Sequence, residues 1–360
     1  MNVPKLRFSN FSNDYEIKEI ADITYNVSSG KISKQLEDGQ YNVYGSMGII
    51  GKSNFYDYTG EKVLVARVGA NAGSVNKINE NCCISDNTLV LEPKDILNDY
   101  LYYSLTYFNP KKLIFGSGQP LVTGAQIKKI KLSIPKKEEQ LKVADFLSLL
   151  DKKIELQSKK IEDLKLFKLY TKNQIFKDYD EILKLKDILV KWNKKNKNNS
   201  VKYVESISNK YGFISQSDQF EDRNVASKDL SNYYIIEKEV FGYNPSRLNV
   251  GSLALKTTDK VSVVSPLYEC FTTSQNNQYL LEWFDSKYFR KETISKFEGG
   301  VRNTLNFSNL CEIKIGLPTI EKQNKYSRIF KTFNNKIEFE VKKLYKLQEL
   351  KKGLMKNMFV

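Results

Sequence analysis

A stretch in the middle of this 360-residue chain returns at its C-terminal end. The sequence Pro-Lys-Lys-Glu-Glu-Gln at 135–140 matches Pro-Thr-Ile-Glu-Lys-Gln at 318–323, so the second copy is numbered 183 higher (318 − 135), a difference called here the repeat offset. The match continues without a gap as far as Phe176 and Phe359. Whatever fold the chain adopts must therefore contain this element twice, with a long and largely non-matching segment before each copy.

Both copies carry apolar side chains at alternating steps of four and three residues. This spacing keeps one stripe of a long helix against a partner helix, so each copy is predicted to form one helix of about 40 residues, at 135–180 and 318–360. Polar residues interrupt the stripe at matching places, such as Lys168 and Lys351. The seam of the helix pair, and of a partner docked on it, is expected to comprise Leu147, Leu150, Ile154, Ile161, Leu164, Phe330, Phe333, Ile337, Leu344 and Leu347.

The order of the segments constrains how they connect. A globular segment at 1–134 leads into the first helix, and a second one at 181–317 leads into the second helix. If the two seams pair, the second helix has to run antiparallel to the first. Short strand-like runs in both segments indicate mixed domains. The expected fold class is α+β, with two mixed α/β globular domains joined by two long antiparallel coiled-coil helices and a pseudo-two-fold relation.

The chain contains no histidine. This excludes Ser-His-Asp and Cys-His nucleophilic sites, HExxH zinc sites and nucleases that use a histidine base. The four cysteines show no C-x-x-C pair and no other metal-ligand spacing, so they are expected to be reduced thiols. A nuclease based on carboxylates or lysine stays open at this point, although no tight acidic cluster with a following lysine indicates one, and no metal or cofactor site is predicted.

Two short stretches come close to cofactor motifs without completing them. Residues 46–53 end like a phosphate-binding loop, but Ser46 stands where the first glycine is required, so nucleotide binding is not expected. The sequence Asn-Pro-Ser-Arg at 244–247 is similar to the Asn-Pro-Pro-aromatic loop of adenine methyltransferases, yet it lacks the second proline and the aromatic residue. We interpret this second stretch as structural or DNA-facing.

The charge balance favours a polyanionic partner. The chain has 57 Lys and Arg against 42 Asp and Glu, a net charge of +15 at pH 7, and such a surplus binds phosphates with release of counterions. The total does not distinguish DNA from RNA or from an acidic protein, and a basic run such as 191–197 is also typical of a solvated loop. No apolar run is long enough to cross a bilayer and no signal-peptide pattern begins the chain, so a cytoplasmic location is expected.

Polar, glycine-bearing loops lie between the predicted strands of both globular segments. Side chains in such loops supply the donors and acceptors that hold phosphates or contact base edges. The candidate DNA-binding residues are Ser46, Lys52, Arg67, Asn71 and Gln119 in the first segment, and Gln216, Arg223, Arg247, Arg302 and Asn303 in the second.

The order of these segments resembles the DNA-specificity subunit of type I restriction-modification systems. The chain runs from a variable head through a Pro-x-x-Glu-x-Gln entrance into a long helix, and then repeats that order. Short stretches of sequence are also similar to this family, at 44–51 and 67–69 in the first head and at 241–247 in the second. The resemblance covers nearly the whole chain. Its departures are mild, because the two helices have diverged from each other and the second entrance begins with Leu-Pro.

The resemblance implies two target-recognition domains, at 1–134 and 181–317, that each bind one half of a bipartite DNA site. The spacer helices at 135–180 and 318–360 would set the length of the unread gap. It also implies three kinds of partner: double-stranded DNA, two modification (methyltransferase) subunits and the restriction (translocase and endonuclease) subunits. A membrane is not among the implied partners.

The resemblance further implies that the chemistry belongs to other chains. S-adenosylmethionine would bind in the modification subunit, ATP and Mg in the restriction subunit, and this chain would be a non-catalytic specificity subunit. Two alternatives remain open at this point: a self-sufficient DNA-modifying enzyme, and a coiled-coil scaffold that does not bind DNA.

Overall fold

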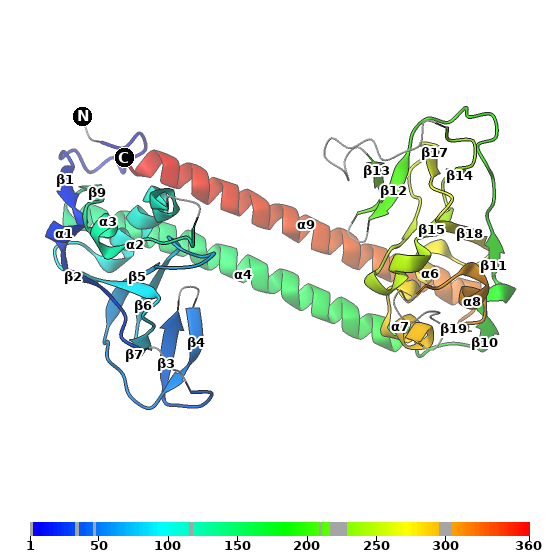
Figure 1. Cartoon of the computed structure of the whole chain (residues 1–360), viewed down its shortest axis with the longest axis horizontal. Coiled ribbons are helices and arrows are strands. Elements are labelled where there is room, and N and C mark those ends of the chain that lie inside the picture. The colour runs from blue at the N-terminus through cyan, green and yellow to red at the C-terminus, as the bar shows by residue number, and fades with distance from the viewer. Residues whose placement is uncertain are drawn as a thin grey trace. The chain divides into compact units, whose positions relative to one another are not determined.

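The computed structural model describes residues 3–32, 36–45, 48–114, 118–208, 211–216, 229–294 and 304–360, without the side chains of residues 249 and 250. The chain divides into two compact units. The first is Met1–Lys159 with Val341–Val360, and the second is Lys160–Glu340. Two helices of 39 residues each, α4 (Lys137–Ile175) and α9 (Ile320–Met358), contribute to both units (Figure 1). The two long helices predicted from the repeat are thereby confirmed.

The first unit combines several small sheets with short helices. Its strands are β1 (Glu16–Glu19), β2 (Thr24–Ser29), β3 (Tyr41–Gly45), β4 (Gly48–Ser53), β5 (Glu61–Ala66), β6 (Val75–Asn79), β7 (Cys82–Ile84), β8 (Thr88–Pro93) and β9 (Lys131–Ile134). They pair in the orders β2-β8-β5-β6, β4-β3-β7 and β1-β9. Its helices besides α4 and α9 are α1 (Ile20–Ile23), α2 (Asn98–Phe108), the 3-10 turn η1 (Pro110–Leu113) and α3 (Gly124–Lys128).

The second unit is built in a similar way. Its strands are β10 (Glu181–Lys184), β11 (Leu189–Lys191), β12 (Glu205–Ser208), β13 (Gly212–Ser215), β14 (Tyr234–Ile236), β15 (Phe241–Tyr243), β16 (Leu253–Leu255), β17 (Ser262–Val264), β18 (Glu269–Thr273) and β19 (Lys314–Leu317). They pair in the orders β11-β18-β15-β16, β10-β19, β12-β13 and β14-β17. The short helices are η2 (Leu185–Asp187), η3 (Pro245–Val250), α6 (Asn277–Phe284), α7 (Lys287–Ile294) and α8 (Phe307–Cys311).

One topology recurs in the two units. In both four-stranded sheets the first strand pairs with the last, and the second strand lies between the last and the third. A two-stranded antiparallel ribbon, called here the frame, is formed by β1 and β9 in the first unit and by β10 and β19 in the second. Its register is the same in both, with Glu16 opposite Ile134 in the first unit and Glu181 opposite Leu317 in the second. The numbering differs by 165 (181 − 16) between the first members of these pairs and by 183 (317 − 134) between the second members. The heads are therefore related, and the second is longer.

The short helix before each Pro-x-x-Glu-x-Gln entrance also begins in the same way. Thr123 caps α3 by accepting a hydrogen bond from the backbone N–H of Gln126 (3.2 Å). Asn306, its counterpart at the repeat offset, caps α8 by accepting one from Asn309 (2.8 Å). Both residue types are strong helix N-caps because a side-chain oxygen satisfies a first-turn N–H. The structural repeat thus extends from the helices back into the heads.

Each head packs its own helix against both long helices. In the first unit the core joins Leu101 of α2 to Val143 and Leu147 of α4 and to Met355 and Met358 of α9. The start of α4 therefore lies beside the end of α9, which is an antiparallel arrangement.

In the second unit the end of α4 lies beside the start of α9. Phe176, directly after α4, contacts Phe330 of α9 with ring centroids 5.8 Å apart and Tyr279 of α6 at 5.4 Å. The expected α+β class and the antiparallel helices are thus confirmed within each unit. The ten predicted seam residues are all buried or half-buried, with Leu147 and Phe330 fully so.

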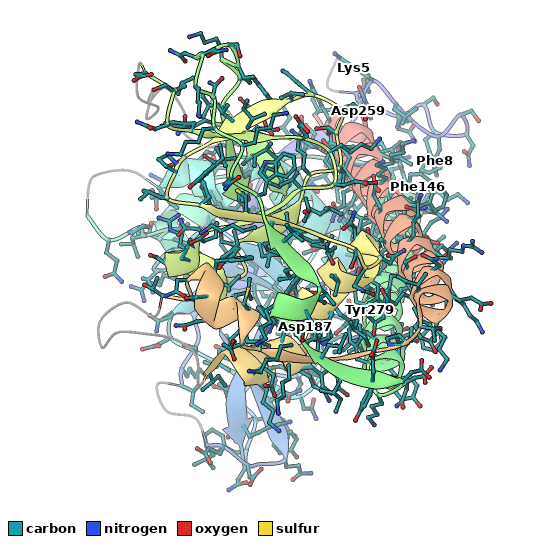
Figure 2. All side chains as sticks on the ribbon, turned by 90° about the vertical axis from the view of Figure 1, so that its right-hand side faces the viewer. Lys5, Phe8, Phe146, Asp187, Asp259 and Tyr279 are labelled. Carbon is teal, nitrogen blue, oxygen red and sulfur yellow. The ribbon has the colours of Figure 1, made fainter. Side chains whose placement is uncertain are left out.

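The N-terminal segment is part of the first unit. The backbone N–H of Leu6 donates to the carbonyl oxygen of Asn357 on α9 (2.8 Å). The ring of Phe8 meets that of Phe146 on α4 edge-on, with centroids 6.0 Å apart (Figure 2). This segment therefore contacts both long helices. None of the helices in the described part of the chain is both long and apolar enough to span a membrane.

Candidate nucleic-acid interface

Three of the predicted DNA-binding residues of the first unit lie on two loops that touch. Arg67 and Asn71 are in the loop between β5 and β6, where Asn71 is exposed and Arg67 half-buried. Gln119 is exposed on the segment that precedes α3. The backbone N–H of Gly69 donates to the carbonyl oxygen of Pro120 (3.0 Å) and so joins the loops. The structure therefore brings these three residues to one surface.

The turn that presents Asn71 requires glycines. Gly69 and Gly73 have φ of 80° and 79°, a region that residues with a Cβ atom rarely adopt. A Cβ atom on Gly73 would also lie 2.5 Å from the backbone nitrogen of Lys111. The loop conformation is thus fixed by the backbone, which leaves the Asn71 side chain free to face solvent.

Arg247 occupies the corresponding loop of the second unit. It is exposed on η3, which lies between β15 and β16. Asn244 caps this turn by accepting a hydrogen bond from the backbone N–H of Ser246 (3.0 Å), and Gly251 ends it with φ of 90°. The Asn-Pro-Ser-Arg stretch is therefore a capped 3-10 turn that presents an arginine.

The same hydrogen bond ties the candidate loop to its neighbour in both units. The backbone N–H of Val122 donates to Arg67 O (2.8 Å) in the first, and that of Leu305 donates to Pro245 O (3.1 Å) in the second. Val122 and Leu305 are equivalent positions at the repeat offset. Equivalent loops on equivalent frames thus carry different side chains, which is the arrangement expected of two different recognition surfaces.

Lys52 is engaged inside the β4-β3-β7 sheet. Its Nζ donates to Asn42 Oδ1 (2.7 Å), and Asn42 Nδ2 donates in turn to the carboxylate of Glu80 (3.1 Å). Hydrogen bonds from Tyr44 and Asn42 hold the pKa of the Glu80 carboxyl below its usual value, while burial raises the pKa of Tyr44 to about 12. Lys52 is half-buried, so it stabilises the hairpin and retains only part of its donor capacity for a phosphate.

Of the remaining candidates, the structure describes one. Gln216 is half-buried at the end of β13, where its backbone N–H donates to Val204 O (3.1 Å). The other four candidates lie outside the described residues, namely Ser46, Arg223, Arg302 and Asn303.

The repeated glutamine of the entrance fixes each head to its long helix, a role that its residue type alone did not reveal. Gln140, 2% exposed, accepts a hydrogen bond from the backbone N–H of Leu97 (2.9 Å), the residue that precedes α2. Gln323, 1% exposed, accepts one from Asn276 (3.1 Å), which precedes α6. Each glutamine also donates to the carbonyl oxygen of the entrance proline at 2.9 Å. The one indication of this role in the sequence was that the glutamine recurs at the repeat offset, as Gln140 and Gln323.

Replacing Gln323 with alanine is expected to lower the free energy of unfolding of the second unit by about 1–3 kcal/mol, because the N–H of Asn276 loses its partner inside the structure. Gln140→Ala should have the same effect on the first unit. Urea unfolding followed by circular dichroism measures both changes. The exposed Gln348 on α9 is the matched control, and an equal loss in Gln348→Ala would contradict a special role for the entrance glutamines.

Polar residues of the two long helices connect the heads to the helix pair in equivalent ways. In the first unit Lys351 of α9 pairs with Asp151 of α4, which also accepts a hydrogen bond from Tyr103 Oη on α2 (2.8 Å). In the second unit Lys168 Nζ of α4 donates to Asn334 Oδ1 of α9 (2.7 Å). The repeat offset relates Lys168 to Lys351, and it also relates Asp151 to Asn334.

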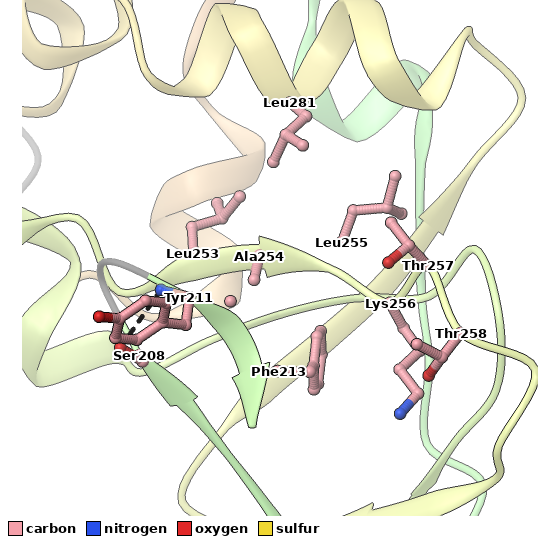
Figure 3. Close-up of a pocket in the computed structure, with 11 residues that line it drawn as sticks. Ser208, Tyr211, Phe213, Leu253, Ala254, Leu255, Lys256, Thr257, Thr258 and Leu281 are labelled. Carbon is pink, nitrogen blue, oxygen red and sulfur yellow. Dashed lines mark hydrogen bonds between the residues drawn. The ribbon is translucent and has the colours of Figure 1, made fainter. Parts of the chain in front are cut away.

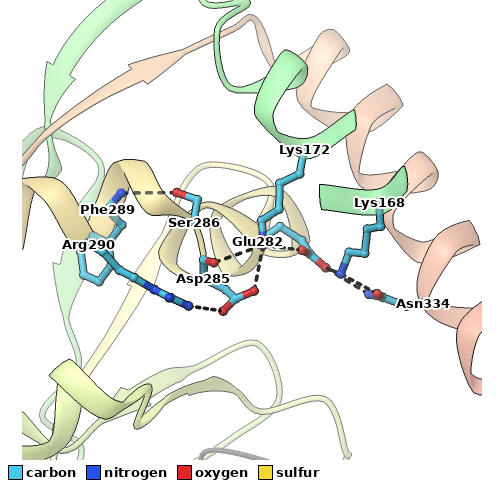
Figure 4. Close-up of polar contacts among 8 residues, drawn as sticks. All are labelled: Lys168, Lys172, Glu282, Asp285, Ser286, Phe289, Arg290 and Asn334. Atoms are coloured by element: carbon cyan, nitrogen blue, oxygen red, sulfur yellow. Dashed lines mark hydrogen bonds and ion pairs between the residues drawn. The ribbon is translucent and has the colours of Figure 1, made fainter. Parts of the chain in front are cut away.

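The second unit carries more charge at this junction (Figure 4). Glu282 of α6 accepts hydrogen bonds from Lys168 Nζ (2.8 Å) and Asn334 Nδ2 (3.1 Å). It also forms an ion pair with Lys172 (3.0 Å), and Lys172 in turn contacts the exposed Asp285 (2.9 Å). The side chains of Glu282 and Lys172 are almost fully buried, so each neutralises the other where water does not reach.

A hollow of about 300 Å³ lies between the β12–β13 hairpin and β16 (Figure 3). Its buried cation, Lys256, is 1% exposed and paired with Glu205, which also accepts a hydrogen bond from Ser262 Oγ (2.5 Å). Much of the remaining lining is apolar, including Phe213, Leu253, Leu255 and Leu281. Because its charge is already neutralised, we interpret this hollow as a packing feature beneath the hairpin.

The cysteines lack the properties of nucleophiles. Burial raises the pKa of both Cys82 and Cys270 to about 12 and also raises those of Cys83 and Cys311, so all four thiols are protonated at neutral pH. All four are free, and within the described ranges no group of three or more Cys, Asp or Glu side chains could hold a metal ion.

Comparisons with known proteins agree with the geometry. The family model of the type I restriction modification DNA specificity domain matches residues 12–166. A putative type I specificity subunit of Mycoplasma pneumoniae is 32% identical over 145 residues, which cover 38% of this chain and 47% of that protein. A type I restriction enzyme specificity subunit of Methanocaldococcus jannaschii is 26% identical over 336 residues, covering 81% of this chain and 77% of that one.

The fold itself recurs in a solved structure. The crystal structure of the S subunit of a type I restriction-modification system from M. genitalium aligns over 99% of both chains with a TM-score of 0.65 and 15% sequence identity. At this sequence identity the alignment supports a shared fold, and the sequence matches show similarity to specificity subunits over part of the chain or most of it. In sequence and in fold, the chain is similar to type I restriction-modification specificity subunits.

Proposed function

We propose that this chain selects the DNA site of a type I restriction-modification complex, with each head binding one half of a bipartite sequence. The observation that carries the proposal is the pair of equivalent loops. A shared frame presents Arg67 and Asn71 in the first head and Arg247 in the second, each loop held by the same backbone hydrogen bond. The two heads share one backbone frame but present different side chains. This arrangement suits a DNA site whose two halves differ in sequence.

The electrostatics suit duplex DNA. A net charge of +15 favours association with phosphates. Arginine and asparagine side chains make bidentate contacts with guanine and adenine edges in the major groove, and backbone amides and lysines hold phosphates. The exposed Asn71 and Arg247 are placed on conformationally fixed turns, as base-reading side chains require.

The long helices offer surface for partner subunits. Their seams are already filled within the chain, yet large apolar side chains remain exposed on their outer faces. Leu149 is 68% exposed and Leu156 59%. Further exposed apolar residues on the helices are Leu166, Phe167, Leu169, Tyr170, Phe339, Tyr345 and Leu350. Exposed apolar surface of this extent is typical of protein interfaces, so we assign these faces to two modification subunits.

The chemistry is then divided between chains. This chain positions DNA and partners. The modification subunits, with S-adenosylmethionine, methylate adenine N6, and the restriction subunits, with ATP and Mg, translocate and cleave DNA. The protonated, buried thiols and the absence of histidine from the sequence are in keeping with a chain that selects a site without reacting at it.

Single-molecule sequencing of adenine methylation tests the proposal. DNA is taken from cells that express this chain together with its modification subunit. The expected result is one bipartite motif with a fixed gap, methylated once on each strand. A well-formed complex that produces no such motif would contradict the proposal and leave the scaffold alternative.

Substitution of the loop arginines should act on one half-site at a time. Arg247→Ala is expected to weaken discrimination in the half-site of the second head by about 1–3 kcal/mol, the usual worth of a bidentate base contact, and Arg67→Ala to do so in the other half. Competition binding with duplexes altered in one half-site measures the effect. Arg290, which is exposed in the second unit, is the control. Equal losses in both half-sites would indicate that Arg247 contacts a phosphate or supports the fold and does not contact a base.

A further inference from the structure

The segment 193–202 of the second unit is a surface loop with an internal anchor. Asn196 is 1% exposed, and its amide donates to Val201 O (2.9 Å) while its Oδ1 accepts from Val201 N (3.1 Å). Its backbone N–H donates to Tyr233 O (3.0 Å). Asn199 closes the turn with φ of 51°, a left-handed conformation that asparagine adopts more readily than most residues.

Both ends of this loop are fixed to the β14–β17 ribbon. Before the loop, the backbone N–H of Ile235 on β14 donates to Lys194 O (2.7 Å). After it, the backbone N–H of Val263 on β17 donates to Tyr203 O (2.8 Å). The loop conformation is therefore set by the second unit itself and does not depend on a ligand.

Lys195 and Lys197 stand on either side of the buried Asn196, and both are exposed. Neither forms a salt bridge with any acidic residue in the described part of the chain, whereas several of their neighbours do. Lys191 pairs with Glu269 (3.1 Å) and Lys194 pairs with Glu237. The loop thus presents two exposed lysine side chains without a counter-charge.

The composition of the loop indicates which anion it suits. Residues 193–200 are all Asn, Lys or Ser, without an apolar or aromatic side chain. Protein interfaces are enriched in aromatic residues at their centres, whereas phosphate contacts are made by lysine, asparagine, serine and backbone amides.

We propose that loop 193–202 is a phosphate clamp of the second head, in which Lys195 and Lys197 bind adjacent backbone phosphates of duplex DNA and Asn196 holds them in position. The clamp rests on the proposed function. It contributes affinity and fixes the register of the head on the duplex, while base recognition remains with the loop that carries Arg247.

The salt dependence of binding tests the clamp. The full-length chain is titrated against a short mixed-sequence duplex labelled with fluorescein, over a series of NaCl concentrations. Lys195→Ala with Lys197→Ala is expected to reduce the slope of log K against log salt by about 1.8, or about 0.9 for each phosphate lost, and to weaken binding roughly tenfold to a hundredfold near 0.1 M salt. Lys195→Arg with Lys197→Arg should keep the wild-type slope.

Two further variants separate placement from charge. Asn196→Ala keeps both lysines but removes their anchor, and binding is expected to weaken in the same direction while circular dichroism shows a folded chain. Lys152→Ala with Lys153→Ala removes the same charge from an exposed face of α4 and should leave the slope unchanged.

The possible failures are distinguishable. An unchanged slope in the Lys195 and Lys197 double variant, or an equal reduction in the Lys152 and Lys153 control, overturns the clamp alone. A wild-type chain whose duplex binding shows no salt dependence overturns the proposed function together with the clamp.

Discussion

Replacing Glu282 with alanine is expected to lower the free energy of unfolding of the second unit by about 3–5 kcal/mol, because Lys168 and Lys172 are then left near each other without their shared carboxylate. Urea denaturation followed by circular dichroism measures the loss. Asp285→Ala is the matched control, because Asp285 contacts Lys172 from a solvent-exposed position and should cost less than about 1 kcal/mol. Equal losses in both variants would contradict the central role of Glu282.

The same carboxylate gives the second unit a defined pH response. Burial alone raises the pKa of Glu282, but Lys172 and Lys168 outweigh it, and the pKa in the folded chain lies below the usual value. Stability from this group is therefore fully present above the ordinary glutamate pKa and is lost as the pH falls through the folded value. Glu282→Gln should flatten the acid side of the stability profile, and an unaltered profile would assign the acid sensitivity to other groups.

Exchanging residues 16–134 for the same segment of an unrelated family member is expected to replace one half of the methylated motif completely and to leave the other half and the gap unchanged. The cut points follow the frame of the first unit, since β1 and β9 pair with each other and stay together in the exchange. Tyr15 and Glu139, which share a hydrogen bond of 2.9 Å, remain in the chain, as does Gln140.

Sequencing of adenine methylation shows the outcome. The reciprocal exchange of residues 181–317 is the control and should alter the opposite half of the motif. A chimaera that changes both halves, or that changes the gap, would contradict the assignment of one head to one half-site.

The internal repeat made the long helices and their direction predictable. Comparing the chain with itself at the repeat offset revealed the matching apolar stripes, and α4 and α9 have the expected length and antiparallel packing within each unit. The loops that carry Arg67 and Arg247 were also identifiable, because glycine, asparagine and proline at turns have local conformational preferences.

The attachments between elements could not be predicted, because they join residues that are distant in the sequence. Gln140 meets Leu97 across 43 residues, and Gln323 meets Asn276 across 47. Lys52 was predicted as a DNA-binding residue, yet Asn42 on the neighbouring strand accepts a hydrogen bond from its amine. Such pairings follow from strand register and helix packing, which residue types do not reveal.

The position before each entrance glutamine is occupied by opposite charges. Glu139 is 2% exposed and is held by the Arg7 guanidinium through two bonds of 2.7 Å and by Tyr15 Oη. Lys322, in the equivalent place, pairs with Asp178 and Asp180 in solvent. Asp180 is the counterpart of Tyr15, because each directly precedes the first strand of its frame.

The first head is attached beside Glu139 and the second beside Lys322, and we call these two attachment positions sockets. Because their charges are opposite, the two sockets should differ in which heads they accept when heads are exchanged. If a second head moves to the first socket together with residues 178–180, its aspartates face the buried Glu139, which is costly, whereas a first head that moves with Tyr15 to the second socket forfeits only an exposed ion pair. Shuffling libraries should therefore recover heads at their original socket or moved from first to second, and frequent recovery of the opposite move would disprove this polarity. New specificities would then arise mainly by exchange of heads between different chains. Within one chain, a head would move from the first socket to the second but rarely the other way.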